Sequence, residues 1–160
     1  MSAKAARGLG VTRRLKKVFP VAVVKLIYSA IVHPYITYGC SIWASNFVMN
    51  YKRTQIIQNK ALRLIGEFQN CQNTAECFRK NDILNIGELR DYQLAIIVFQ
   101  NVNKVSPEYF YDFFKTNSFY HPYFTRNLED LTHERRNTTR AGFVLRNIGV
   151  SVWNDLPESV

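Results

Sequence analysis

The apolar run at positions 21–32 constrains the fold of this chain most. Valine, isoleucine, leucine and tyrosine fill nearly every side of a helix drawn through these residues, so we expect a core helix that is buried from several directions. Pro20 suits the first turn of such a helix, and His33 followed by Pro34 predicts its end, because proline disfavours the helical conformation in the residue before it. A second helix, over residues 34–44, is expected to stack its aromatic side chains against the first. These side chains are Tyr35, Tyr38 and Trp43.

The length and composition of the chain predict one folded core. With 160 residues, 47% of them apolar, the chain can bury a sizeable hydrophobic interior. We expect a mainly α fold, a helical bundle with a long loop and a short extended C-terminal segment. Residues 1–115 would form the helical domain, and residues 116–160 a loop-rich extension that packs on it.

Further helices are predicted from periodicity and from residues that start or stop helices. Gly8 and Gly10 weaken the first segment, so that its helix is expected from Val11 onward. Thr74 suits the start of a short helix that ends in a turn at 82–84. Further helices are expected over 51–68 and 86–103. Ser106 and Pro107 predict the start of another helix, which continues over 109–114. Residues 143–148 are predicted to form a short strand, with Trp153 and Leu156 anchoring the tail on the helices.

Positive charge is concentrated in the first part of the chain. Residues 1–66 hold eleven Lys or Arg and no Asp or Glu, whereas the remaining residues hold ten basic and twelve acidic side chains. Such a one-sided distribution indicates an anionic partner, a phosphate backbone first and an acidic membrane second. The alternative is a solvated basic face without a partner.

Two groups of cations are the candidate binding residues. In a helix over 51–68, the residues Ile57, Ala61, Leu64, Ile65 and Phe68 share one arc, and four cations share the neighbouring arc. A nucleic-acid backbone needs charge at successive positions and little side-chain geometry, so this stripe could bind phosphates. The stripe consists of Lys52, Arg53, Lys60 and Arg63, and the second group consists of Arg13, Arg14, Lys16 and Lys17.

Two other segments leave alternatives open. The aromatic residues of 109–114 could stack on bases or close the hydrophobic core, and the second interpretation is favoured. The helix at 86–103 is expected to be buried, because it has a wide apolar face and further apolar residues on its other sides. The residues of that face are Leu89, Tyr92, Gln93, Ile96, Ile97 and Gln100. Residues 116–139 lose periodicity and gain Asn, Thr, His and charge, which predicts an extended loop. A loop of this length is either a surface excursion or a segment that contacts nucleic acid.

Six short stretches, in order along the chain, resemble the C-terminal part of one family of proteins. The last of them holds a Trp-Asn pair followed by Leu-Pro, at Trp153, Asn154, Leu156 and Pro157. The family is that of the non-LTR retrotransposon reverse transcriptases (LINE-type, jockey/CR1-like), and the match looks like the thumb and the region after the polymerase palm. The six stretches are 28–43, 58–63, 78–86, 107–110, 123–126 and 149–157.

The resemblance implies nucleic-acid binding without catalysis. In that family, paired aspartates of the palm hold two metal ions, and a separate endonuclease domain uses acidic residues and histidine. This chain has no Asp-Asp pair, and its first aspartate is Asp82. We therefore expect no polymerase or nuclease activity in isolation, no catalytic residues and no cofactor. The thumb of the family grips the template–primer duplex, so an RNA or RNA/DNA duplex backbone is the expected partner, with the missing palm or a second copy as further partners.

Cysteine, histidine and hydropathy set the remaining expectations. Cys40, Cys71 and Cys77 make an odd count without a secretory leader, which favours a reduced, intracellular setting, in the cytoplasm and nucleus. Cys71 and Cys77 lack the paired close spacings of a zinc site, so no metal site is predicted. No membrane span is expected, because Lys25 interrupts the most apolar stretch.

The sequence leaves more than one function open. The first is a thumb fragment that holds a duplex through basic helix faces. The second is a truncated or captured helical module that binds itself or another protein and has no role at nucleic acid. The third is a reading frame from a decayed element, without a selected role.

Overall fold

The protein is a mainly α structure, as the sequence predicts. The computed structural model describes residues 2–46, 48–65, 74–121, 123–135, 137–138, 142 and 144–157. Its α-helices are α1 (Ser2–Leu15), α2 (Val21–Ile27), α3 (His33–Thr37), α4 (Cys40–Asn46), α5 (Val48–Ile65), α6 (Thr74–Lys80), α7 (Ile86–Val102), α8 (Asn117–Tyr120) and α9 (Leu145–Asn154). A π-helical turn covers Tyr28–Val32 and a 3-10 turn covers Glu108–Phe110. The described part of the chain holds no β-strand, and its one β-type pairing is an isolated bridge between Thr116 and Leu131.

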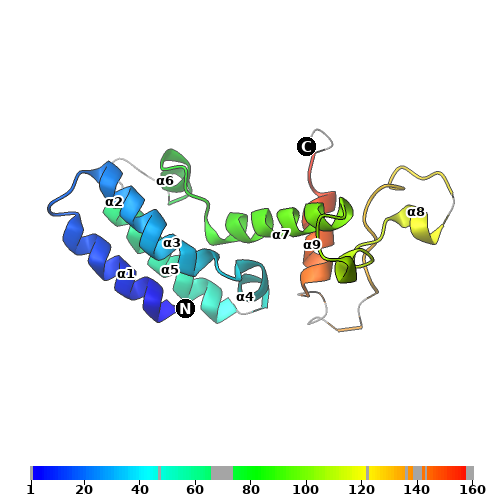
Figure 1. The fold of residues 1–160 in the computed structure, drawn as a ribbon, viewed down its shortest axis with the longest axis horizontal. Helices are drawn as coiled ribbons and strands as arrows, with labels where there is room; N and C mark the ends of the chain where they lie inside the picture. Colours follow the sequence, from blue (N-terminus) through cyan, green and yellow to red (C-terminus); the bar gives the residue numbers. More distant parts are fainter. Residues whose placement is uncertain are drawn as a thin grey trace. The chain divides into compact units, whose positions relative to one another are not determined.

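The chain divides into two compact units, Met1–Leu89 (unit 1) and Arg90–Val160 (unit 2). The division falls within α7 (Figure 1), because Ile86 and Leu89 pack in the core of unit 1 and Val98 packs in the core of unit 2. The domains predicted from the sequence divide after residue 115 and stay a prediction.

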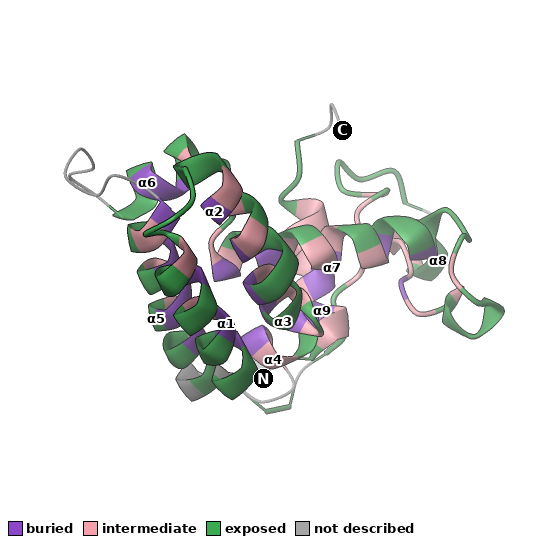
Figure 2. Ribbon diagram, turned by 60° about the vertical axis from the view of Figure 1, so that its left-hand side comes forward, coloured by how far each residue is buried: buried purple, intermediate pink, exposed green. Residues whose placement is uncertain are grey.

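Helices α1 and α5 form the frame of unit 1. They lie side by side and run in the same direction, and the segment from α2 to α3 runs back beside them (Figure 1). Their buried sides face one another, and their outer sides are exposed (Figure 2). The buried cluster consists of Ala5, Val24, Tyr28, Val32, Ile36, Cys40, Ala44, Ile57, Ala61, Ile65, Ile86 and Leu89.

Helix α1 begins earlier than the sequence predicts, at Ser2 and not near Val11. The helix packs closely on the π-helical turn at Gly8. A Cβ at this position would lie 3.0 Å from Cγ2 of Ile31 and 3.1 Å from Cγ2 of Val32. Gly8 therefore permits a close helix contact, and this packing outweighs the low helix propensity of glycine.

The helix at 21–32 does not end at Pro34, so that prediction was wrong. The chain widens into a π-helical turn, in which the His33 N–H donates to the carbonyl of Tyr28, and it continues as α3. Shifting the hydrogen bonds by one residue lets the helix pass a proline that lacks an N–H. The break comes instead at Gly39, whose φ of +62° lies in the left-handed region that favours glycine.

The same segment is buried on one side only, in contrast to the expectation of burial from several directions. Every fourth residue, Val24, Tyr28 and Val32, is buried, whereas Leu26 is 68% exposed. Helix α1 and helix α5 both pack on this single stripe. The apolar residues outside the stripe stay in contact with solvent.

Two of the three aromatic side chains expected to stack on this helix do not do so. Tyr35 and Tyr38 are exposed. Trp43 packs against the core of unit 1, and its Nε1 donates to the carbonyl of Tyr38 at 3.0 Å. The turn at Gly39 therefore directs one aromatic residue inward and leaves the other two on the surface.

Helix α5 confirms the predicted inner arc where the structure describes it. Ile57, Ala61 and Ile65 are buried, and Leu64 is half-buried. Phe68 lies outside the described residues. Helical periodicity was sufficient here because one side of the helix faces the core along its whole length.

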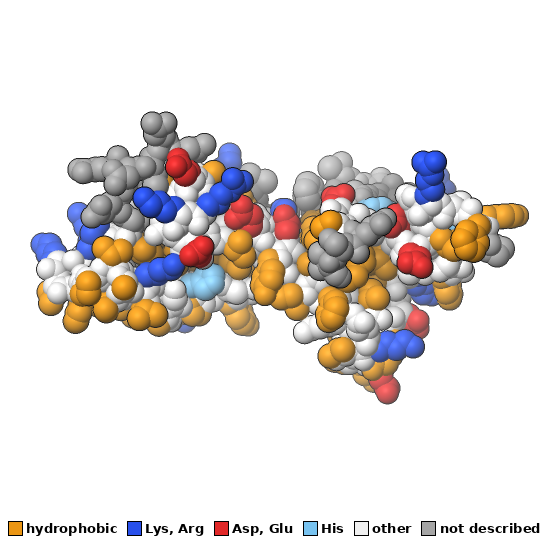
Figure 3. Space-filling model, turned by 90° about the horizontal axis from the view of Figure 1, so that it is seen from above, with side chains coloured by type: hydrophobic (Ala, Val, Ile, Leu, Met, Phe, Trp, Pro, Cys, Tyr) orange, Lys and Arg blue, Asp and Glu red, His pale blue; other side chains and the backbone are white. Residues whose placement is uncertain are grey.

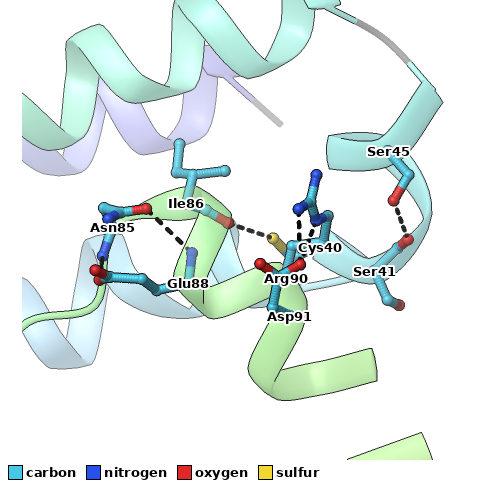
Figure 4. A network of polar contacts seen from close by, with 8 residues as sticks. All are labelled: Cys40, Ser41, Ser45, Asn85, Ile86, Glu88, Arg90 and Asp91. Carbon is cyan, nitrogen blue, oxygen red and sulfur yellow. Dashed lines mark hydrogen bonds and ion pairs between the residues drawn. The ribbon is translucent and has the colours of Figure 1, made fainter. Parts of the chain in front are cut away.

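Helix α7 begins at the predicted residue, Ile86, and ends at Val102, one residue before the predicted end. A reciprocal cap fixes its start (Figure 4). The Glu88 N–H donates to Oδ1 of Asn85 at 3.1 Å, and the Asn85 N–H donates to Oε2 of Glu88 at 2.9 Å. The Cys40 thiol donates to the carbonyl of Ile86 at 3.9 Å, which ties α4 to this end of α7. The short helix before it, α6, starts at the predicted Thr74.

The apolar face predicted for α7 is buried only in part. Leu89 is buried, whereas Tyr92 and Ile96 are exposed. The buried residues Leu94, Val98 and Asn101 lie on another side of the helix. The residues 109–114 also differ from the prediction, because they form only a 3-10 turn followed by irregular chain. Within that segment, Phe114 is buried in the core of unit 2, as the favoured interpretation predicts. Tyr109 is 97% exposed, in contrast to that interpretation.

Helix α9 stands where a short strand was predicted. It spans Leu145–Asn154 and packs its residues Leu145 and Trp153 on a small core of Val98, Phe114, Leu131 and Val150. Between them lies Gly149, where a Cβ would come within 3.1 Å of Cγ2 of Val98 and 3.4 Å of the Phe114 ring. The residues Leu145, Gly149 and Trp153 recur at helical spacing, and this spacing prevailed over the apparent alternation at 143–148.

No helix in the described ranges combines the length and the hydropathy that crossing a lipid bilayer requires.

Candidate nucleic-acid interface

The two units differ completely in charge. Unit 1 holds thirteen Lys or Arg and four Asp or Glu, and unit 2 holds eight of each. The whole formal charge of +9 therefore belongs to unit 1. An anionic partner would be attracted to this unit over long range.

The four candidate cations of α5 lie on the side of the helix that faces away from the core. Lys52, Arg53, Lys60 and Arg63 are all exposed. On the helix, Lys52 and Arg63 lie roughly opposite to the buried Thr54, and the exposed Ile56 lies beside them. Arg53 and Lys60 lie about 100–120° from Thr54, nearer to the flank of the helix. From the first of these cations to the last, the helix rises by about 16 Å, which corresponds to about five phosphates of one strand.

The second group of cations lies where α1 ends. Arg13 and Arg14 belong to the last turn of the helix, and Lys16 and Lys17 belong to the turn that follows. All four side chains are exposed. The chain reverses directly after them, because the N–H groups of Val18 and Phe19 both donate to the carbonyl of Leu15, each at 2.9 Å.

The structure brings the second group and part of the first to the same end of unit 1. Because α1 and α5 run in the same direction, the residues 13–17 lie at the same end of the unit as Lys60 and Arg63 (Figure 1). Lys52 and Arg53 lie earlier along α5. On the face drawn in Figure 3, the Lys and Arg side chains of this unit stand apart from one another, with some carboxylates between them.

Ion pairs between described residues occur in unit 2. Arg90 pairs with Asp91 at 2.7 Å (Figure 4), and Arg146 pairs with Glu134. In unit 1, the Lys4 ammonium lies 6.0 Å from the centre of the Tyr35 ring. The described carboxylates of unit 1 are Glu76, Asp82 and Glu88, and all follow α5 in the chain.

Gln58 connects the inner side of α5 to the chain before α7. Its side chain is fully buried, and its Nε2 donates to the carbonyl of Leu84 at 2.7 Å. Gln58 belongs to a stretch, 58–63, in which Lys60 and Arg63 point outward and Ala61 is buried. The same short stretch of α5 thus contains the buried Gln58, which connects the helix to the chain before α7, and two of the exposed cations.

The two titratable groups whose pKa shifts in unit 1 are structural. Burial raises the pKa of Tyr28 to about 12, offset in part by the neighbouring Gln58 side chain. Burial lowers the pKa of His33, whose ring lies 6.2 Å from that of Tyr28. Tyr28 is therefore neutral at physiological pH, and His33 favours its neutral form. Neither group adds charge to the basic surface.

The described residues bring together no group of three or more His, Cys, Asp or Glu that could hold a metal ion. Cys71, which entered the prediction about zinc, lies outside the described ranges. The chemistry that the surface of unit 1 supports is electrostatic attraction of a polyanion.

Two exposed cations of α1 were absent from the candidate residues. Lys4 and Arg7 lie on the same helix as Arg13 and Arg14, and their side chains are exposed. No other cation lies next to either of them in the sequence, whereas the candidate residues were chosen because they occur in groups. The signal that could have included them is the absence of any acidic residue from 1–66.

Comparison with known proteins gives one significant similarity. The chain is 40% identical, over 83 residues, to the probable RNA-directed DNA polymerase from transposon X-element of Drosophila melanogaster. The aligned residues make up 52% of this chain and 8% of that protein, so the chain matches only a small part of its relative. No protein-family model and no solved structure matches the chain.

Proposed function

We propose that this chain is a non-catalytic piece of a non-LTR retrotransposon reverse transcriptase, from its thumb-like C-terminal part, and that it binds the backbone of an RNA/DNA template–primer. The similarity to the X-element polymerase supports the class of protein. The observation that carries the binding role is the exposure of Lys52, Arg53, Lys60 and Arg63 on the outer side of α5, in the unit that holds all of the net charge.

The proposed contact recognises the charge of the phosphates and not the base sequence. Lys and Arg side chains on a helix bind phosphate oxygens and release the counterions that were condensed on the nucleic acid. Phosphate contacts position a protein on a duplex but carry no sequence information. The second cationic group, Arg13, Arg14, Lys16 and Lys17, would extend the contact at the end of the unit where Lys60 and Arg63 lie.

The proposed role includes no chemistry by this chain. Its sequence contains no pair of adjacent aspartates, so nucleotidyl transfer would need another part of a larger protein. That part, or a second copy of this chain, would be its protein partner. Action at RNA and at chromosomal DNA would place it in the cytoplasm and the nucleus.

Charge reversal on α5 tests the proposal. We expect Lys52→Glu with Lys60→Glu to weaken binding of a fluorescent RNA/DNA duplex at least about tenfold at 50 mM salt, because two phosphate contacts become repulsive. The dependence of log affinity on log salt should become shallower by about two, roughly one for each lost contact. Fluorescence anisotropy over a series of salt concentrations measures both quantities.

A matched control changes the same charge elsewhere. Lys104→Glu with Arg135→Glu alters two exposed cations of unit 2, and we expect it to change duplex affinity much less. An equal loss of duplex affinity in the two double variants would show that the net charge of the chain, and not the position of the cations, causes the effect. A duplex affinity that is absent at low salt, or independent of salt, would contradict the proposal.

A second candidate function is a helical protein-interaction module, and the exposed apolar residues of unit 1 favour it. Leu26 of α2, Tyr38 at the end of α3 and Ile42 of α4 are mostly exposed, although other residues of these helices pack in the core. In that case, sedimentation would show a tight oligomer. The variants Lys60→Glu and Arg63→Glu would then leave its association intact.

A further inference from the structure

We propose that the loop of unit 2 between Thr116 and Thr132 is a second binding site, for single-stranded nucleic acid, on which unpaired bases stack. This site goes beyond the proposed function, because it lies outside the cations of α5 and uses aromatic rings in place of charge. The residues that carry it are Phe119, Tyr120, Tyr123 and Phe124, with Arg126 beside them.

The base of this loop is closed by backbone hydrogen bonds. The N–H of Asn117 donates to the carbonyl of Asp130 at 2.9 Å, and the N–H of Ser118 donates to the carbonyl of Leu128 at 3.0 Å. The N–H of Thr132 donates to the carbonyl of Lys115 at 2.8 Å. The two ends of the loop are therefore held next to each other, as in a compact surface loop.

Side chains fix the loop to α9. Nδ2 of Asn154 donates to the carbonyl of Leu131 at 3.0 Å, and the N–H of Leu131 donates to Oδ1 of Asn154 at 3.1 Å. The Leu131 side chain is buried in the core of unit 2. Within the loop, Nδ2 of Asn117 donates to the carbonyl of Asn127 at 2.7 Å. These contacts fix the base of the loop, so less entropy would be lost on binding than for an unstructured segment.

The rings of the loop are nonetheless turned to solvent. Phe124 is 99% exposed and Tyr123 is 75% exposed, and Phe119 and Tyr120 are also mostly exposed. Burial of a Phe side chain typically stabilises a folded protein by about 1.5–3 kcal/mol. Several rings left exposed in one loop therefore indicate a binding surface. Two of the rings already have a neighbour on one side. The centre of the Tyr123 ring lies 6.5 Å from that of the His121 ring, with an angle of 29° between their planes. The Lys115 ammonium lies 4.1 Å from the centre of the Phe119 ring.

The neighbours of these rings favour bases over a protein surface. The other described residues of the loop tip are polar, and they include Thr125, Arg126 and Asn127. The core of a protein interface is depleted of charge, whereas base stacking uses aromatic faces with hydrogen-bonding groups and cations nearby, as this loop offers with Arg126 and Asn127. Unpaired bases offer a face to such a ring whatever their sequence.

The charge of the loop distinguishes this site from the surface of α5. From Lys115 to Thr132 the chain holds two cations and two carboxylates, and its formal charge is zero. Attraction of phosphates therefore contributes little, and stacking would supply most of the affinity. Binding at this site should depend weakly on salt, in contrast to binding at the basic helix.

The experiment measures the affinity of the full chain for a fluorescein-labelled single-stranded RNA at high salt, where contacts to phosphates are weak. We expect Tyr123→Ala with Phe124→Ala to lower this affinity at least about tenfold, because each stacked base is lost. The variant Phe124→Trp should retain the affinity, and its added tryptophan emission should be quenched when RNA binds. Tyr109→Ala is the matched control, since Tyr109 is 97% exposed and lies outside the loop.

The same variants are titrated with the RNA/DNA duplex, which separates this inference from the proposed function. Loss of single-strand affinity with unchanged duplex affinity supports the loop site. Unchanged single-strand affinity in the Tyr123 and Phe124 variant, or an equal loss in Tyr109→Ala, overturns it and leaves the role of α5 intact. A loop that binds a protein and not RNA would leave the single-strand affinity of the Tyr123 and Phe124 variant unchanged. A chain that binds single strands through the loop but fails to bind the duplex contradicts only the function proposed for α5.

Discussion

Unit 1 and unit 2 are stabilised in different ways and are suited to different ligands. Unit 1 buries side chains from most of its helices in one apolar cluster and carries all of the net charge on its outside. Unit 2 has a small apolar cluster and no net charge, and hydrogen bonds from asparagine side chains hold its long loop. Apolar packing leaves a helix surface available for long-range attraction of a polyanion, whereas a pinned loop can present rings for contacts at short range.

One side-chain amide in each unit makes this comparison testable. Gln58 of unit 1 donates to the carbonyl of Leu84, and Asn154 of unit 2 exchanges two hydrogen bonds with the backbone of Leu131. Gln58 is fully buried, and Asn154 is half-buried. The cost of removing each amide should therefore differ between the units.

The largest effect is expected from Gln58→Ala. The substitution removes a hydrogen bond, leaves the Leu84 carbonyl without this donor and opens a cavity between helices that are otherwise close-packed. We expect the free energy of unfolding to fall by about 2–4 kcal/mol, measured by urea denaturation. Gln100→Ala, at an exposed position of α7, should change it by no more than about 0.5 kcal/mol. Equal effects at the two positions would show that the buried amide contributes nothing special to unit 1.

A smaller and more local effect is expected from Asn154→Ala. The substitution leaves the N–H and the carbonyl of Leu131 without their side-chain partner, at a cost of about 1–3 kcal/mol. Because the amide connects α9 to the loop, hydrogen exchange should accelerate first at Asn117, Ser118 and Thr132. Asn103→Ala is the control, since this exposed amide only donates to Phe99 at the end of α7. Unchanged exchange in the loop of the Asn154 variant would mean that backbone contacts alone hold it.

The smallest effect is a pH dependence specific to unit 1. Burial lowers the pKa of His33, so the folded state binds fewer protons than the unfolded state near and below the ordinary histidine value of 6.5. The stabilisation by the neutral ring is present above pH 6.5 and is lost as the pH falls below it. Denaturation midpoints measured between pH 7.5 and pH 5.5 should decrease on acidification, and His33→Gln should reduce this decrease. An unchanged pH dependence in the variant would show that His33 does not contribute to it.

The sequence anticipated the parts of the fold in which one helix face meets the core without interruption. The extent of α7 and the outward side of the α5 cations follow from helical periodicity, because residues three and four apart share a side of a helix. Helix α5 begins at Val48, three residues before the predicted start, and its predicted end at Phe68 lies outside the described residues. The same reasoning placed Lys52, Arg53, Lys60 and Arg63 on the outside, where the structure has them. Whether these cations bind nucleic acid stays a prediction.

The sequence reasoning failed where distant segments meet. Gly8 looked like a helix breaker, but the approach of α1 to Ile31 and Val32 requires a residue without a side chain. Pro34 looked like a helix end, but the chain passes it through a π-helical turn. Trp153, one of the two expected tail anchors, does pack on the core of unit 2, but nothing nearby in the sequence identifies Leu131 as the partner of the adjacent Asn154.

The sequence by itself determined that the chain is helical, that its first 66 residues carry no acid, and that the outer face of one helix is basic. These properties depend on spacing within one segment and on composition. Only the tertiary structure decided that residues 21–32 bury a single stripe, that α9 replaces a strand, and that a pinned loop presents its aromatic rings to solvent. Those properties depend on which surfaces meet, and contacts between residues far apart in the chain are not encoded in any local pattern.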